Sequence, residues 1–154
     1  MELILNLCLN INLTQMKNII INVLAVLLGL IIGSVVNGGL IQISGTIIPP
    51  PAGIDVTTEA GLRQALPLFE PKHFIFPFLA HALGTLIGAF FAALIATSYK
   101  LQLALIVGFI FLIGGIFMVF LVPSPIWFTI LDLLVAYIPM ALIGGKLIIK
   151  KNEK

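Results

Sequence analysis

The sequence predicts an all-α, polytopic membrane protein: a four-transmembrane-helix bundle with a short external amphipathic helix. Of the 154 residues, 60% are hydrophobic and 9% charged, and the mean hydropathy is +1.22. A soluble domain usually has about 25% charged residues, because its surface faces water. Four apolar runs also reach the roughly 20 residues that a helix needs to cross a hydrocarbon core about 30 Å thick. We therefore expect a single domain, residues 1–154, that lies in the lipid bilayer.

Short connections join the last three of the four predicted transmembrane helices. The expected bounds are 18–43, 74–99, 101–122 and 126–149. The second and third runs are separated by little more than "SYK", which predicts an antiparallel hairpin. Pro123 and Pro125 are suited to stop the third helix and start the fourth, and Trp127 is suited to the membrane interface.

Residues 1–17 are expected to form an N-terminal tail. They alternate Leu or Ile with Asn, a period of two that resembles a strand. The run from Met16, "MKNIIINVLAVLLGLIIGS", reads like the natural start of a membrane protein. We therefore interpret residues 1–15 as an over-extended start or a disordered tail, with an interfacial segment as the alternative. A cleaved signal peptide is disfavoured, because the first apolar run continues well beyond 15 residues without a small-x-small site.

The external connection, residues 44–73, is the one sizeable polar segment of the sequence. Asp55 or a Thr can cap a short helix there, and Pro67 would end it. The apolar side chains at helical spacing on one face of that helix are Leu62, Ala65, Leu66 and Phe69. This pattern predicts a helix that lies on the membrane surface or roofs the bundle, either as a plain cover or as a substrate lid.

Basic residues predict the orientation. With a cytoplasmic N-terminus, six basic residues lie inside and two outside. The inside set is Lys17, Lys100, Lys146, Lys150, Lys151 and Lys154, and the outside set is Arg63 and Lys72. Both termini, including a tail at 150–154, are therefore expected in the cytoplasm. The basic residues flank the apolar runs and form no patch, so nucleic acid is not an expected partner.

Small residues recur every four positions in the second predicted helix and let a neighbouring backbone approach closely. The expected packing positions are Gly29 and Gly33 in the first helix and Gly84, Gly88 and Ala92 in the second. His81 shares this stripe of the second helix, so it should face a packed neighbour.

A polar cluster is predicted inside the bundle. A carboxylate such as Asp132 within a spanning helix costs roughly 2.5 to 3.5 kcal/mol, so it needs a partner. At about 1.5 Å per residue, Asn37, His81 and Asp132 each lie about 10 Å below the outer surface, with Thr85 one turn deeper. The cluster could be a structural clasp worth about 0.6 to 2 kcal/mol per hydrogen bond. It could instead be a proton-titratable or ligand-binding pocket that opens outward, or its members could fail to meet.

Motifs for other chemistries are missing from the sequence. His73 and His81 lie eight residues apart, roughly 12 Å along a helix, which is too far for one metal centre. Cys8 is the single cysteine, so there is neither an internal disulfide nor a thiolate cluster. Walker, GxSxG and HExxH motifs do not occur. We expect no metal, no cofactor and no enzymatic activity.

The segments "FEPKHFIFPFLAHALGTLIGAFFAALIA" and "PIWFTILDLLVAYIP" resemble a group of small, functionally uncharacterised four-helix integral membrane proteins of bacteria. The resemblance implies an inner-membrane location and this architecture, and it carries no catalytic motif. The leading expectation is a non-enzymatic accessory or interaction component that associates with itself or with another membrane protein. The alternative is a small transporter or proton-coupled permease subunit that uses His81 and Asp132.

Overall fold

The computed structural model is an all-α four-helix membrane bundle, as the sequence predicts, and 85% of it is helical. It describes residues 2–51, 53 and 55–152, with side chains from residue 11 to residue 150. No strand occurs among these residues. Four helical spans are long and apolar enough to cross a membrane, namely Ile11–Ile47, Pro71–Ile95, Lys100–Leu121 and Ile126–Lys150.

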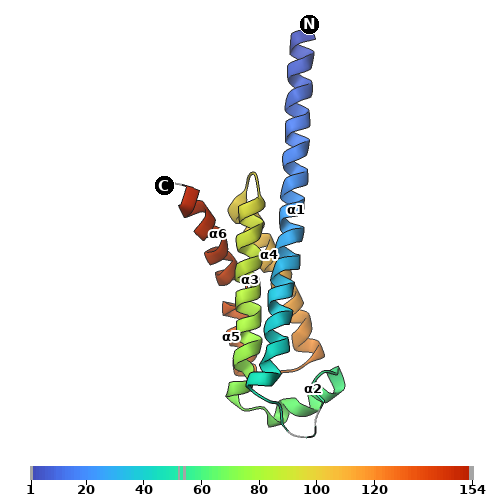
Figure 1. Ribbon diagram of the computed structural model, residues 1–154, viewed down its shortest axis with the longest axis vertical. Helices are drawn as coiled ribbons and strands as arrows, with labels where there is room; N and C mark the ends of the chain where they lie inside the picture. Colours follow the sequence, from blue (N-terminus) through green and yellow to red (C-terminus); the bar gives the residue numbers. More distant parts are fainter. Residues whose placement is uncertain (1, 52, 54, 153–154) are drawn as a thin grey trace.

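Six α-helices and two short 3-10 helices follow one another in the described part of the chain (Figure 1). They are α1 (Glu2–Ile47), α2 (Glu59–Ala65), η1 (Leu66–Leu68), η2 (Pro71–Phe74), α3 (Ile75–Ile95), α4 (Lys100–Leu121), α5 (Ile126–Val135) and α6 (Ile138–Asn152). Both ends of the chain lie at one end of the bundle, which we call the terminal end, and α2 lies at the opposite loop end (Figure 1).

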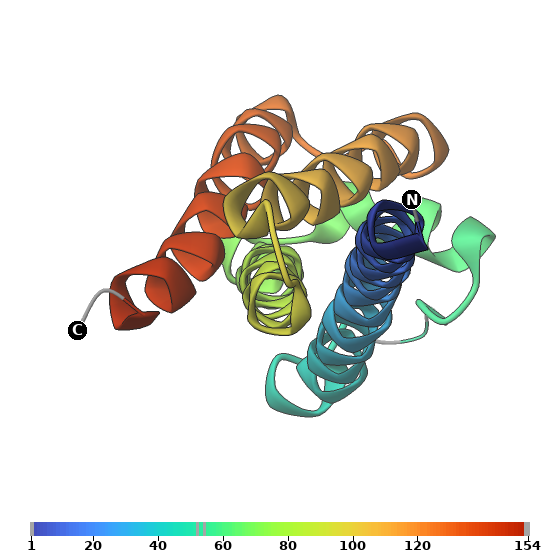
Figure 2. The same cartoon turned by 90° about the horizontal axis from the view of Figure 1, so that it is seen from above.

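Helix α3 is the centre of the bundle and packs against α1, α4 and α6 (Figure 2). The predicted packing residues form its contact with α1. A Cβ atom on Gly29 would lie 2.6 Å from the carbonyl oxygen of Gly88 and 2.9 Å from the Cβ of Ala92, and a Cβ on Gly33 would lie 2.6 Å from the carbonyl oxygen of Gly84. The two backbones therefore touch where only glycine fits, which is how small residues bring transmembrane helices together.

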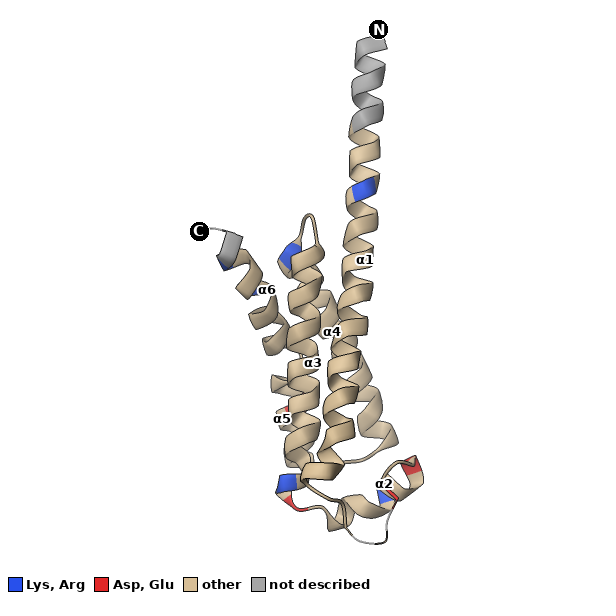
Figure 3. Cartoon of the chain, viewed as in Figure 1, with Lys and Arg blue, Asp and Glu red and all other residues tan. Residues whose placement is uncertain are grey.

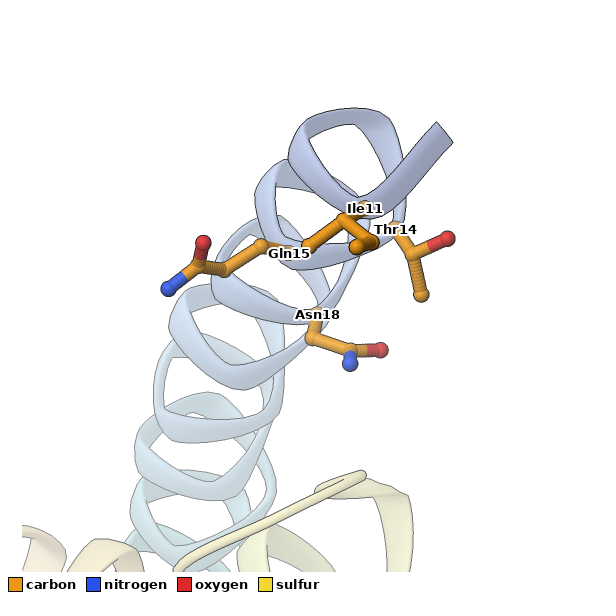
Figure 4. A pocket seen from close by; sticks show the side chains of 4 residues that line it. All are labelled: Ile11, Thr14, Gln15 and Asn18. Atoms are coloured by element: carbon orange, nitrogen blue, oxygen red, sulfur yellow. The ribbon is translucent and has the colours of Figure 1, made fainter. Parts of the chain in front are cut away.

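Helix α1 differs from the predicted division into a tail at 1–17 and a span at 18–43. It runs without interruption over 46 residues, about 70 Å at 1.5 Å per residue, more than twice the hydrocarbon thickness of about 30 Å. Before Gly29 the helix contains neither glycine nor proline, so no helix-breaking residue separates residues 2–17 from the span. The N-terminal part of α1 projects beyond the rest of the bundle (Figure 1), and a groove on α1 is lined by Ile11, Thr14, Gln15 and Asn18 (Figure 4).

The predicted hairpin between the second and third spans is present, and α1 holds its turn. The Asn22 side chain donates to Ser98 Oγ at 2.9 Å and accepts from the Thr97 backbone N–H at 3.0 Å. Tyr99 turns the chain with a φ of 52°. The Lys100 ammonium then donates to the carbonyl oxygen of Ala96 at 2.6 Å and closes the end of α3.

The fourth span is broken, whereas the sequence predicts one continuous helix over 126–149. Helix α5 ends at Val135 and α6 begins at Ile138. Pro139 has no N–H to donate to the carbonyl of Val135, four residues earlier, so the helical ladder is interrupted there. The break places Ala136 and Tyr137 inside the bundle, where both are buried.

The loop end carries the short helix that the sequence predicts. Thr58 is its N-cap and accepts a hydrogen bond from the Gly61 N–H at 3.1 Å. Just before it, the Thr57 hydroxyl and backbone N–H both donate to Asp55, and the hydroxyl contributes most to lowering the pKa of that carboxyl. Ala65 is fully buried. Helix α2 therefore covers the bundle, as one of the two predicted placements requires.

Candidate functional site

The predicted contact between His81 and Asp132 is present. Helix α3 supplies the imidazole and α5 the carboxylate, 51 residues apart in the chain. His81 Nδ1 lies 2.9 Å from both carboxylate oxygens. The Asp132 side chain is 7% exposed and that of His81 is 23% exposed. With Asp132 ionised, its oxygens can only accept, and the hydrogen of the imidazole is then on Nδ1.

Tyr137 completes the cluster, and the sequence analysis missed it. Its hydroxyl donates to Asp132 Oδ2 at 3.0 Å. Its ring stacks on the His81 imidazole, with centroids 5.7 Å apart and planes at 28°. Five residues on a regular helix are separated by about 140°, so Asp132 and Tyr137 would point apart if the fourth span were continuous. The break after α5 brings them together.

The other two predicted members lie beside the cluster without joining it by hydrogen bonds. Thr85 is buried one turn deeper on α3. With His81, Tyr137 and Asn37 it lines a small cavity of about 10 Å³. Asn37, on α1, is half-buried. In the part of the chain that the structure describes, no hydrogen bond links Asn37 to His81 or Asp132. The hydrogen-bonded cluster therefore consists of His81, Asp132 and Tyr137, and the predicted members Asn37 and Thr85 lie beside it.

A larger cavity of about 350 Å³, the loop-side cavity, lies between the cluster and the loop. Leu62, Leu66 and Phe69 roof it, and His81 and Asp132 form its floor. The remaining lining residues come from all four spans and their connections and are mostly apolar: Asn37, Ile41, Phe74, Pro77, Gly115, Met118, Val119, Val122, Ser124, Phe128 and Thr129. An apolar cavity with a few convergent polar groups is the usual form of a small-molecule site.

A second cavity adjoins the loop-side cavity. It has a volume of about 440 Å³, shares Ile41, Leu62, Phe69 and Pro77 with the loop-side cavity, and reaches His73. Phe69 stacks on the His73 ring at a centroid distance of 4.8 Å, so it forms part of the wall between the two cavities. His73 itself accepts from the Glu70 N–H at 3.0 Å and lies outside the buried cluster.

On the terminal side of His81, α1 and α3 pack tightly. Beyond the small cavity beside Thr85, the two helices meet backbone to backbone at Gly29 and Gly88. The larger cavity that His81 and Asp132 line extends from them toward the loop end.

The fold and site define a class: a four-helix membrane protein with a buried His–Asp–Tyr cluster beneath a loop-side cavity. No group of three or more metal-ligating side chains is found among the described residues. Comparison of the chain with protein-family models, curated proteins and solved structures gives no match.

Proposed function

We propose that this protein is a non-enzymatic small transporter or proton-coupled permease subunit that takes up a small, mainly apolar ligand from its loop end. The observation that carries the proposal is the position of the His81–Asp132 pair at the floor of the 350 Å³ cavity. A histidine beside a carboxylate can take up or release a proton, and this pair lies where a ligand would sit.

The broken fourth span supports the same proposal. Many transporters bind substrate beside discontinuous helices near the middle of the membrane, where unpaired backbone groups are available. Here the break between α5 and α6 lies next to Asp132 and supplies Tyr137 to the site.

We also propose that the terminal end faces the cytoplasm, across a bacterial inner membrane. Basic residues gather there on α1, at the α3–α4 turn and on α6, whereas the loop end carries both charge signs (Figure 3). This distribution fits the positive-inside rule, and the resemblance of the sequence to small bacterial membrane proteins suggests the compartment. The loop-side cavity would then open away from the cytoplasm.

The test is proton movement in proteoliposomes loaded with the pH-sensitive dye pyranine. The three probes are benzyltrimethylammonium, its uncharged carbon isostere neopentylbenzene, and the anion 4-tert-butylbenzoate. We expect at least one probe to move protons with the wild-type protein, and His81→Gln and Asp132→Asn to abolish that movement while membrane yield is kept. Gln102→Ala, an exposed position on α4, is the control. If no probe moves protons, or if both variants only lower thermal stability, the cluster is a structural clasp.

One feature favours a second candidate, an accessory component that associates with itself or with another membrane protein. The side of α1 that faces away from the bundle exposes large apolar side chains along its length, among them Ile19, Val23, Leu27, Ile31 and Val35. Co-purification of a stable partner, or a defined oligomer by light scattering after mild solubilisation, is the expected result. A monomer under those conditions contradicts this candidate.

A further inference from the structure

The charge of the loop-side cavity limits the ligands that it can hold. Asp132 supplies a carboxylate at the floor, and no Lys or Arg is among the described residues that line the cavity. The two basic side chains of the loop are already paired, Arg63 with Glu59 at 2.9 Å and Lys72 with Glu70 at 3.0 Å. A negatively charged ligand would therefore add a second negative charge beside Asp132 without a compensating cation.

The titratable groups at the floor come from three elements. They are His81 on α3 and Asp132 on α5, with Tyr137 from the break before α6 bonded to Asp132 behind them, whereas α1 and α4 contribute Asn37 and apolar residues. With a neutral imidazole the His–Asp pair has a net charge of −1, and with a protonated imidazole its net charge is zero. A cation would therefore be balanced by the first of these forms and not by the second.

The walls above the floor suit the same kind of ligand. Phe69, Phe74 and Phe128 line the cavity, and the rings of Phe74 and Phe128 lie 4.8 Å apart between centroids. Aromatic faces attract organic cations by about 0.5 to 2 kcal/mol, and more strongly away from water. An apolar body with one positive charge would therefore meet aromatic walls and a carboxylate in one cavity.

We infer that the ligand of this cavity is a small organic monocation with an apolar body, and that it binds in exchange for the proton of the His81–Asp132 pair. This inference rests on the proposed function and specifies its substrate class. In the exchange, the cation enters, the imidazolium of His81 releases one proton to water, and the net charge of the occupied site stays at zero.

The native reporter is Trp127, the single tryptophan of the chain. Its ring lies 5.5 Å from that of Phe74, a lining residue of the cavity. We would follow Trp127 fluorescence of the full chain in lipid nanodiscs while titrating the same three probes. Benzyltrimethylammonium keeps its charge at every pH, and neopentylbenzene matches its shape without the charge.

We expect benzyltrimethylammonium to bind at least about tenfold more tightly than neopentylbenzene, and 4-tert-butylbenzoate not to bind. One exchanged proton makes the apparent Kd of the cation fall by up to about tenfold per pH unit as the pH rises. In unbuffered solution, up to one proton should be released for each cation bound.

Two variants separate this exchange from a purely structural role. Asp132→Asn should lose the preference for the cation. His81→Gln keeps the carboxylate, so it should still bind the cation but without the pH dependence of the wild type and without proton release. Gln102→Ala should behave like the wild type. The inference is overturned if the neutral or anionic probe binds as tightly as the cation, or if Asp132→Asn keeps the preference. If only the neutral or the anionic probe binds, the proposed function still stands. If none of the three probes binds, both this inference and the proposed function are contradicted.

Discussion

At the residue scale, the main feature is the buried Asp132 carboxylate, which has two hydrogen-bond partners. Burying Asp132 in a spanning helix costs roughly 2.5 to 3.5 kcal/mol on insertion scales. The His81 imidazole and the Tyr137 hydroxyl both donate to it. No buried side-chain nitrogen or oxygen in the described part of the chain lacks a hydrogen-bond partner. The cluster thus holds α3, α5 and the break before α6 in one arrangement.

Tyr137→Phe tests this account, because it removes one donor and changes the volume little. We expect the free energy of unfolding to fall by about 1 to 2 kcal/mol, since a buried hydrogen bond to a charged group is lost. Unfolding in mild detergent measures it. In the Asp132→Asn background the same change should cost less, because the charged acceptor is already gone. Equal costs in the two backgrounds would contradict a direct interaction between Tyr137 and Asp132.

At the scale of the elements, the contact between α1 and α3 decides how the bundle is built. Glycines on both helices allow their backbones to touch, and the Asn22 side chain holds the turn that ends α3. In the fourth span, Pro139 breaks the helix and so turns Tyr137 toward the cluster. The geometry of the site therefore depends on two backbone features, the glycine contact between α1 and α3 and the break before Pro139, whose residues are not themselves members of the cluster.

Two glycines of α1 provide a matched pair for the helix contact. A Cβ on Gly33 would lie 2.6 Å from the Gly84 carbonyl oxygen, whereas a Cβ on Gly38 would have no neighbour within 4 Å. Gly33→Ala should destabilise the protein by about 1 to 3 kcal/mol, because the backbones are forced apart. Gly38→Ala should be neutral or slightly stabilising, since alanine favours helix. Thermal unfolding of both variants measures the difference, and similar melting temperatures would refute the contact.

At the scale of the whole molecule, the four spans put both ends of the chain on one side and the loop on the other (Figure 1). The loop-side cavity and its neighbour lie on the loop side, and the closed contact between α1 and α3 lies toward the terminal end. The two ends of the bundle therefore differ, and the proposed uptake of a ligand from the loop end would depend on this difference.

Cysteine labelling tests this topology. In a Cys8→Ser background, an impermeant maleimide should label Ala60→Cys in right-side-out vesicles and Lys17→Cys in inverted ones, because Ala60 is exposed in the loop and Lys17 on the projecting part of α1. Gel shift after labelling measures it. The opposite pattern would reverse the orientation, and labelling of both positions from one side would contradict a membrane crossing by α1 between them.

The sequence by itself determined that the protein lies in lipid, where most of its spans lie, which small residues pack, and that His81 and Asp132 share one depth. These features depend on local composition and on the helical repeat, which a sequence carries directly. It did not show that α1 continues through residues 2–17. Pro139 is a signal in the sequence for a break in the fourth span, although a continuous helix was predicted there. The sequence did not show that Tyr137 joins the cluster in place of Asn37.

Only the tertiary structure decided those points. Whether side chains on separate helices meet depends on the rotation of each helix about its own axis, and no periodicity within one helix fixes the rotation of another. Here the backbone contact between α1 and α3 and the break before Pro139 set those rotations. The physical reason is that depth in a membrane is a property of one helix, whereas a binding cavity is a property of the space between several.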